Sequence, residues 1–333
     1  MAFAAKKINH KLIKLVEILN DELPHDGTTL GESLDVSRNA IWKMIHRLQL
    51  NGVEISATKG KGYQLKTPLQ LLGESEIISK LPTKIAEQTT TSLFEYIDST
   101  NTYLMQPGNR QHLHLCTTER QTSGRGRFDR SWYSPFAENI YLSLCYQFQM
   151  DPSELTGLSL IIAVSIVNTL RDVFSIDDLS IKWPNDVFYK DQKLSGNLVE
   201  LVAQVHGATT TVIGIGLNVN MSTDDDENIS QAWTSLYNIS GKHYDRNEII
   251  AELLKELLAN IELFKHEGFK PFQAQWNKCS YLYNKEISVN IGKTLHFGTA
   301  KGLTPRGQLI LKTNEGETLH LNAGEVKLKW KKD

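Results

Sequence analysis

The sequence predicts an α/β protein built in three parts, and three patterns along the chain support this. In the first part, apolar residues recur at helical spacing and a short hairpin pattern follows. The middle part mixes strand patterns with two long apolar helices, and the last part alternates short strands with glycine-containing turns. We therefore expect domains at residues 1–66, 83–274 and 275–333, with a linker at 67–82 that holds a short connecting helix at 69–81.

The overall composition is that of a soluble globular protein with a full core. Of 333 residues, 40% are hydrophobic and 22% are charged. A formal net charge of -2 argues against nucleic-acid binding over the whole surface but allows one basic module. Cys116, Cys145 and Cys279 are far apart and lack metal-ligand spacing, which favours reduced thiols over disulfides or a zinc site. Without a signal peptide or a long apolar run, we expect a cytoplasmic protein with no membrane partner.

The first part is predicted to contain three helices. Residues 8–22 carry apolar side chains at helical spacing, and Thr28 or Thr29 can cap a short second helix. Ser37 can cap a third helix that ends near Leu50. The apolar positions that support the first helix are Ile8, Leu12, Leu15, Val16 and Leu19.

The third helix and the hairpin after it predict a DNA-binding surface. The outward face of the helix is polar and cationic, and the hairpin has lysines at its tip, as in the wing of a winged helix-turn-helix. Residues 1–66 hold 10 Lys/Arg against 7 Asp/Glu, so this part is mildly basic. A small helical domain for protein contacts is the alternative. The candidate DNA contacts are Ser37, Arg38, Asn39, Trp42, Lys43, Arg47, Lys59 and Lys61, whereas His46 alone is typical of a surface histidine.

The middle part opens with a strand at residues 93–97, and Ser99, Thr100 and Asn101 follow where a helix would begin. These side chains can cap that helix. They are also compact neutral donors and acceptors at a strand-to-helix junction, which is a common ligand position. Both interpretations remain open from the residues alone.

A second strand leads into a loop at residues 121–132 with the sequence QTSGRGRFDRSW. Its three arginines supply permanent charges that fit phosphate or carboxylate oxygens, and its glycines let backbone N–H groups turn toward a ligand. It is not a Walker A loop. The loop therefore predicts a mobile clamp for an anion, with a solvated surface loop as the alternative.

The next informative stretch is KWPND at residues 182–186, followed by a hairpin that returns at Lys193. Pro184 ends one strand and leaves two polar residues at its tip. A lysine in a hairpin turn is usually only solvent-exposed. Here Ser195 and Gly196 follow it, and small residues let a ligand or another backbone approach.

A glycine-interrupted apolar strand at residues 211–220 fits a position directly under a ligand. Its lone Gly-x-Gly is weak as a dinucleotide signal because no helix opens after it. The acidic run at 224–227 is typical of a solvated loop, and we expect Trp233 in a short helix after it. Residues 157–174 form a strongly apolar helix pattern typical of core, and residues 246–264 form an amphipathic helix pattern.

The last part is predicted to be a small β-barrel of SH3-like size. Short strand patterns are separated by glycine-containing turns. The expected strands are 287–291, 295–301, 308–312, 317–321 and 326–330.

Taken together, these stretches closely resemble the bifunctional biotin–protein ligases and biotin operon repressors of bacteria. The resemblance covers essentially the whole chain and implies a winged helix-turn-helix, a class II synthetase-like mixed-sheet catalytic domain and an SH3-like barrel. Each motif is modest alone, but five in the right order are specific. They are Ser99-Thr100-Asn101, Gln121 with Gly124-Arg125-Gly126-Arg127, Lys182-Trp183-Pro184-Asn185-Asp186, Lys193-Leu194-Ser195-Gly196 and Gly214-Ile215-Gly216-Leu217-Asn218.

The resemblance implies an enzyme that adenylates biotin with MgATP and passes biotin to one lysine of the biotin carboxyl carrier protein of acetyl-CoA carboxylase. It also implies a repressor of biotin synthesis genes that binds operator DNA as an adenylate-bound homodimer. Arg125, Arg127 and Lys193 would be catalytic. The biotin-binding residues would be Ser99, Thr100, Asn101, Gln121, Arg125, Gly126, Arg127 and Lys193, and the residues for ATP or adenylate would be Arg125, Arg127, Lys193, Asn218 and Trp233.

One departure lies in the arginine loop, where Phe128-Asp129 replaces the Arg-Gly of some relatives and predicts a stiffer, less cationic loop. Three alternatives remain open at this point. A lipoate-type ligase would share the fold, a pure transcription factor would use the last two parts only to sense a small molecule, and a ligase could carry a winged helix that no longer represses.

Overall fold

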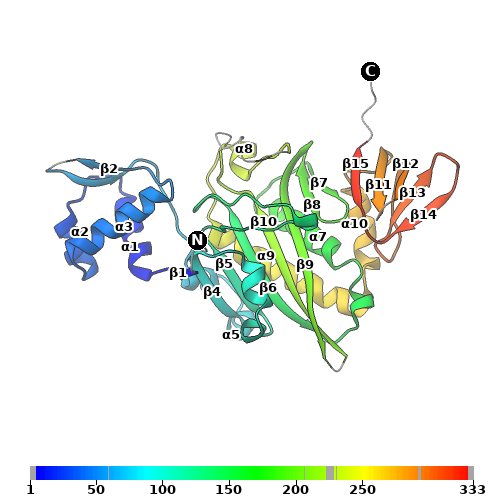
Figure 1. The fold of residues 1–333 in the computed structure, drawn as a ribbon, viewed down its shortest axis with the longest axis horizontal. Helices are drawn as coiled ribbons and strands as arrows, with labels where there is room; N and C mark the ends of the chain where they lie inside the picture. The colour runs from blue at the N-terminus through cyan, green and yellow to red at the C-terminus, as the bar shows by residue number, and fades with distance from the viewer. Residues whose placement is uncertain are drawn as a thin grey trace, which may run out of the picture.

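The three parts follow one another along the long axis of the molecule, with a large sheet at the centre (Figure 1). The computed structural model describes residues 5–58, 60–205, 207–222, 229, 231–291 and 294–328, and for residues 203–205 it describes the backbone alone. Three expectations lie outside these residues: the DNA contact at Lys59, the acidic loop at 224–227 and the final strand residues at 329–330.

The N-terminal part is the predicted winged helix-turn-helix. Ser37 caps its third helix by accepting a hydrogen bond from the Ala40 N–H, as expected. The predicted cap of the second helix was wrong: Asp26 takes this place, because its carboxylate accepts from the N–H groups of both Thr28 and Thr29. The elements are α1 (His10–Leu19), α2 (Gly27–Leu34), α3 (Arg38–Leu50), β2 (Ile55–Thr58) and β3 (Gly62–Leu65).

A short strand at the N-terminus, β1 (Lys6–Lys7), was not predicted. It pairs antiparallel with β4 (Thr90–Tyr96) and so lies on the edge of the central sheet instead of in the winged helix. Phe136 and Ala137 of the central part also join the apolar core of the winged helix. The first two parts therefore share strand pairing and buried apolar contacts.

The linker contains less helix than expected. A single helix from residue 69 to 81 was predicted, but helix α4 covers only Glu74–Ser79 and α5 (Thr83–Gln88) follows. Residues 69–73 run without regular structure because their backbone groups bond elsewhere. Arg246 donates to the Gln70 carbonyl at 2.5 Å, and the Asn247 amide oxygen accepts from the Gly73 N–H at 2.9 Å.

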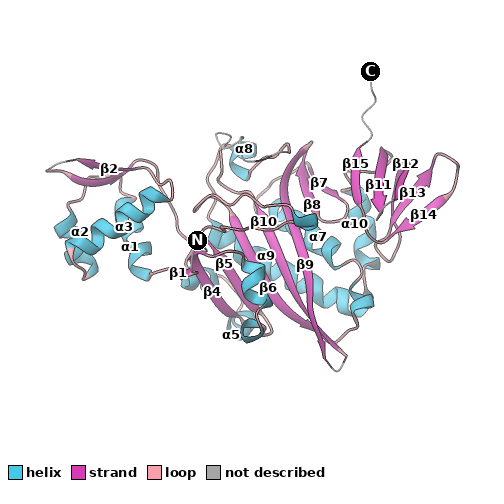
Figure 2. Cartoon of the chain, viewed as in Figure 1, coloured by secondary structure: helices cyan, strands magenta, loops and turns pink. Residues whose placement is uncertain are grey.

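The central sheet has the order β1-β4-β5-β6-β10-β9-β8-β7 (Figure 2). Only β4 and β5 run parallel; the other neighbours are antiparallel. Its further strands are β5 (His114–Thr118), β6 (Ile140–Phe148), β7 (Leu179–Lys182), β8 (Asp186–Tyr189), β9 (Gln192–Val205) and β10 (Ala208–Leu217), and its helices are α6 (Thr100–Met105), α7 (Leu158–Asp172), α8 (Leu236–Ser240), α9 (Arg246–Glu267) and α10 (Gln273–Lys278).

The strands alternate between the two faces of this sheet, as a period of two requires. Leu144 and Ile213 belong to the main core, which includes α7 and α9, while their neighbours Cys145 and Val212 belong to a small cluster under α6. The stretch Pro152–Asp172, which includes α7, has the length and apolarity of a membrane span, but 67% of its apolar window is buried inside the protein. The apolarity of this stretch is therefore explained by its position in the core of the protein.

The C-terminal part is a five-stranded antiparallel sheet of the size expected for the SH3-like domain. Its order is β14-β13-β12-β11-β15, so the last strand lies beside the first. The strands are β11 (Glu286–Ile291), β12 (Thr294–Leu303), β13 (Leu309–Thr313), β14 (Thr318–Leu321) and β15 (Glu325–Leu328).

Candidate active site

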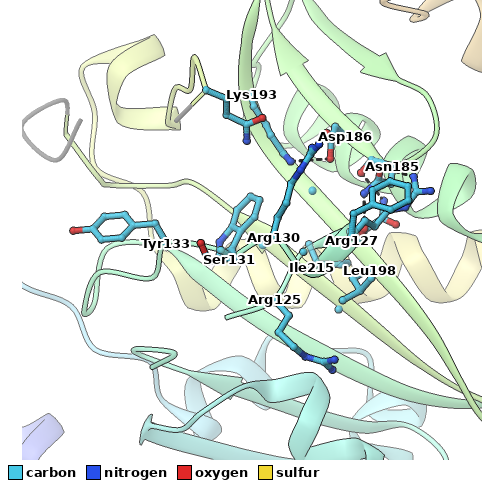
Figure 3. Close-up of a pocket in the computed structure, with 18 of the residues that line it drawn as sticks. Arg125, Arg127, Arg130, Ser131, Tyr133, Asn185, Asp186, Lys193, Leu198 and Ile215 are labelled. Atoms are coloured by element: carbon cyan, nitrogen blue, oxygen red, sulfur yellow. Dashed lines mark hydrogen bonds and ion pairs between the residues drawn. The ribbon is translucent and has the colours of Figure 1, made fainter. Parts of the chain in front are cut away.

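A pocket of about 750 Å³ lies at one end of the central sheet (Figure 3). Its walls come from the start of α6, the arginine loop, the β7–β9 hairpin, the end of β10 and the β15 region of the C-terminal part. Every residue predicted to bind biotin or adenylate lines it. These are Ser99, Thr100, Asn101, Gln121, Arg125, Gly126, Arg127, Lys193, Asn218 and Trp233.

Polar side chains at the start of α6 form a buried network on one wall. Ser99 caps α6, so the capping interpretation and the ligand position coincide at this residue. The Gln121 amide oxygen accepts from the Thr100 N–H at 3.0 Å. Ser143 Oγ lies 2.7 Å from Thr100 Oγ1 and 2.5 Å from Asn101 Oδ1. The network holds these groups in fixed positions, which suits recognition of a small neutral polar ligand group.

Each arginine of the loop has a partner on a different element. Arg125 forms an ion pair with Glu200 of β9 at 2.8 Å, and Arg127 donates to the Asn185 amide oxygen at 3.2 Å. Arg130 forms an ion pair with Glu325 of β15 in the C-terminal part. The loop is therefore held across the pocket from three directions.

The backbone of the loop is unusual at Phe128 and Asp129. Both residues have left-handed conformations, with φ angles of 56° and 55°. Non-glycine residues adopt this region at a cost, and bulky ones rarely do so. Phe128 is exposed, and its ring lies 5.0 Å from the Arg127 guanidinium.

Lys193 returns to the tip of the preceding strand, as the hairpin predicted. Its Nζ lies 3.0 Å from Asp186 Oδ1 and 5.3 Å from the centre of the Trp132 ring, and its side chain is only 15% exposed. Burial lowers the pKa of Lys182, and Asp186 opposes that shift. Burial also lowers the pKa of Arg127, and the charge of Asp186 opposes that shift as well. The pocket thus concentrates cations around one carboxylate.

The floor of the pocket is formed by the glycines of β9 and β10. A Cβ on Gly214 would lie 2.3 Å from Asn101 Oδ1, and one on Gly216 would lie 2.4 Å from Trp132 Cε2. Glycine is therefore required for these side chains to approach the strand. The Trp132 ring covers the floor, and within the described part of the chain its buried indole N–H has no hydrogen-bond partner.

Trp233 is in the pocket but not in the short helix that we expected. Its segment pairs with Lys193 in an isolated bridge, where the Lys193 N–H donates to the Ala232 carbonyl at 3.0 Å. The helix α8 begins three residues later, at Leu236. The expectation was wrong because the backbone of this segment forms hydrogen bonds with the backbone of Lys193 instead of helical ones. Asn218 lies next to it and donates to the Thr234 carbonyl at 2.9 Å.

The two cysteines of the central sheet, Cys116 and Cys145, are poor candidates for nucleophilic chemistry. Burial raises the pKa of the Cys116 thiol well above its ordinary value and raises that of Cys145 to about 11. Both side chains are fully buried in the sheet. They would be protonated at neutral pH, so neither is an activated nucleophile.

Sequence reasoning missed several contributors to this site. Glu200 and Ser143 hold the predicted residues, and Glu325 comes from the C-terminal part. Ser143 could have been noticed as a polar residue between apolar strand neighbours. No local pattern pointed to Glu325, because its partner Arg130 is almost two hundred positions away.

The predicted DNA contacts fall into three groups. Ser37, Arg38, Asn39, Trp42, Lys43 and Lys61 are exposed on α3 and the wing. Trp42 is 51% exposed and stacks on His46 with ring centres 5.1 Å apart. Arg47 differs, because its side chain is 26% exposed and contacts Glu95 of β4. Lys59 lies outside the described residues.

Three family models match the chain. The HTH domain matches residues 11–64, the biotin/lipoate A/B protein ligase family matches residues 93–220, and the biotin protein ligase C-terminal domain matches residues 283–329. Together they span all three parts of the structure.

Individual relatives match over nearly the full length. The bifunctional ligase/repressor BirA of Escherichia coli is 36% identical over 97% of this chain and 98% of its own. The protein of the same name from Bacillus subtilis is 31% identical over 87% of this chain and 90% of its own. The structure of biotin protein ligase from Aquifex aeolicus in complex with biotin and ATP is similar with a TM-score of 0.63 and 29% identity, covering 72% of this chain and 99% of that one.

Proposed function

The chain belongs to the family of bifunctional biotin protein ligases and repressors, and on this premise we propose how its residues perform both activities. It is an ATP-dependent biotin–protein ligase with a DNA-binding repressor module. The observation that carries the ligase assignment is the convergence of the α6 network, the arginine loop and Lys193 on one pocket. We also propose that the domains are bounded near residues 66, 82 and 274 and that the protein acts in the cytoplasm.

The first half-reaction joins biotin to the α-phosphate of ATP. A biotin carboxylate oxygen attacks the α-phosphorus, and the bond to the β-phosphate oxygen breaks as pyrophosphate leaves. Both reactants are anions, so cations are needed to offset their repulsion. Arg125, Arg127 and Lys193 supply that stabilisation from pre-positioned side chains, and such electrostatic effects are usually the largest catalytic contribution.

The second half-reaction transfers biotin from biotinyl-5'-AMP to the acceptor. The neutral amine of a lysine on the biotin carboxyl carrier protein attacks the acyl carbon, the bond to the phosphate oxygen breaks as AMP leaves, and the new amide nitrogen loses a proton to solvent. The mixed anhydride is held without a covalent bond to the enzyme, in agreement with the protonated cysteines. The arginine loop keeps water from this intermediate when it closes.

The remaining pocket residues are assigned by position. Ser99, Thr100, Asn101 and Gln121 would bind the polar ring of biotin, because their uncharged donors and acceptors line one wall of the pocket and the first three are buried. Trp233 and Asn218 would contact the adenylate, with the Trp233 ring over the adenine.

Mg²⁺ enters this proposal as part of MgATP. Within the described ranges, no three His, Cys, Asp or Glu side chains gather as a protein-built metal site. The pocket fits an ion that arrives with the triphosphate, since such Mg²⁺ is held by phosphate oxygens, water and one or two carboxylates. Asp186 is a carboxylate of this kind, and its buried Oδ1 faces Lys193 without a directed hydrogen bond. When bound, Mg²⁺ neutralises phosphate charge.

ATP-dependent incorporation of biotin into a biotin carboxyl carrier domain tests the ligase assignment. We expect incorporation with biotin and none with lipoate in a parallel reaction. Lipoate as the preferred substrate would replace the assignment with a lipoate-type ligase. Failure of both substrates would favour a transcription factor that only senses a small molecule.

The repressor activity is assigned to the winged helix. The exposed cationic and amide side chains of α3 and the wing would contact operator DNA, with Trp42 available for apolar contact with bases. We propose that the adenylate favours a homodimer, which requires tighter binding of the adenylate to the dimer than to the monomer. Sedimentation with and without biotinyl-5'-AMP measures this, and an unchanged monomer would remove the dimer from the proposal.

A further inference from the structure

A carboxylate is buried where the winged helix meets the central sheet. Glu95 lies on β4, and its side chain is 0% exposed. Two cations surround it: Arg47 Nε lies 2.6 Å from its Oε1, and Lys6 Nζ lies 3.6 Å from its Oε2. Arg47 comes from α3 of the winged helix, whereas Lys6 comes from β1, the edge strand of the central sheet.

This contact is an ion pair between charges rather than a well-directed hydrogen bond. Arg47 Nε and both Glu95 oxygens lack a hydrogen-bond partner of good geometry, although the charged atoms are close. Burial raises the pKa of Glu95, whereas the charges of Arg47 and Lys6 act in the opposite direction. Removing the nearer cation from a buried carboxylate is strongly unfavourable, so Glu95 needs Arg47, and with it the winged helix, in this position.

Other contacts at the same joint agree with this arrangement. The Arg120 guanidinium donates to the Asn51 amide oxygen at the end of α3 at 3.3 Å. Strand β1 pairs with β4 at Tyr96 and Phe94, on either side of Glu95 (Figure 1). Glu95 therefore lies at the centre of a joint that fixes α3 at its C-terminal end.

We propose that Glu95 is the docking residue that holds the winged helix on the catalytic domain, and that Arg47 serves this joint instead of contacting DNA. The orientation of the exposed DNA-binding face of α3 then depends on a residue of the catalytic domain. The claim about the DNA-binding face of α3 rests on the proposed repressor function. The claim that Glu95 docks the winged helix does not.

The test uses the full-length protein with Arg47→Gln, Glu95→Gln and the double variant. The matched control is Arg38→Gln, which removes an exposed arginine from the same helix. Two measurements are made on each: amide hydrogen exchange in β1, β4 and the end of α3, and the salt dependence of binding to duplex DNA of mixed sequence. The first reports on the joint and the second counts phosphate contacts.

We expect Arg47→Gln to raise exchange at the joint by about tenfold or more and to leave the slope of log K against log salt unchanged. Glu95→Gln should raise exchange similarly, and the double variant should add little to either single change. Arg38→Gln should reduce the slope by about one and leave exchange unchanged.

The proposal is overturned if Arg47→Gln lowers the salt slope as Arg38→Gln does while exchange at the joint stays at the level of the unmodified protein. If Glu95→Gln fails to fold, the Arg47→Gln variant still tests the proposal, because the Arg47 side chain is partly exposed. If the unmodified protein does not bind duplex DNA, the repressor function fails, and the exchange measurement alone decides whether Glu95 docks the winged helix.

Discussion

The cations of the pocket and the cations of the winged helix are held in different ways. In the pocket, Arg125, Arg127 and Lys193 contact Glu200, Asn185 and Asp186. On α3 and the wing, the side chains of Arg38, Lys43 and Lys61 are exposed to solvent. A cation that must stabilise a transition state gains from being fixed in advance, whereas a phosphate contact on DNA can form from a mobile side chain.

This difference predicts large effects of substitutions in the pocket and small, salt-dependent effects on the winged helix. A cation in a partly buried site acts through a low local dielectric, while an exposed one is screened by water and salt. The four predictions below test that ranking, from the largest expected effect to the smallest.

Lys193→Ala should give the largest effect. We expect adenylate formation, measured by biotin-dependent pyrophosphate exchange, to fall about 10²- to 10³-fold with the fold intact, because a pre-positioned cation is lost. The control is Lys190→Ala, an exposed lysine in the same hairpin, which should remain near wild type. Near wild-type exchange in Lys193→Ala would remove this residue from catalysis.

Arg127→Gly should act on the intermediate. We expect biotinyl-5'-AMP to leave the enzyme roughly ten times faster, since the loop loses its contact with Asn185 and one cation over the pocket. A rapid-dilution experiment with labelled adenylate measures the rate. Unchanged retention would mean that the loop does not close through this arginine.

Glu325→Gln should have a modest effect on the same loop. Its partner Arg130 is 61% exposed, so the ion pair contributes at most about 1 kcal/mol. We expect adenylate release to rise by less than about fivefold. Glu317→Gln, an exposed glutamate of the same domain, is the control. If Glu325→Gln matched Arg127→Gly in size, the C-terminal part would contribute more to the pocket than its exposed contact suggests.

Lys61→Gln should have the smallest effect. Removing one exposed phosphate contact should weaken duplex DNA binding a few-fold at moderate salt and reduce the salt slope by about one. Biotin transfer should be unchanged. A loss of biotin transfer in this variant would contradict the separation of the two cation groups.

Local signals in the sequence were sufficient for most of the pocket. Residues 99–101 and Gln121 follow strands, Lys193 lies at the start of one, and the sheet brings these strand ends to one edge. Helix periodicity and turn residues likewise predicted α1, α3, α7 and α9 to within a few residues. These features depend on neighbours in the sequence, which is why they could be predicted.

The contacts between parts could not be predicted in this way. Arg47 was assigned to the DNA face because helical spacing says only that it points outward, not which surface it meets. Two-residue β1 is too short for a strand pattern, and the pairing of Trp233 with Lys193 depends on a backbone brought close by the fold. Each of these depends on residues that are distant in the chain.

Strand β1 has a consequence for the order of events during synthesis. Lys6 and Lys7 leave the ribosome early, but their partner strand β4 ends at Tyr96, so the pairing must wait until the winged helix has been made. The winged helix can then fold as a unit before its N-terminal strand is taken up by the growing sheet.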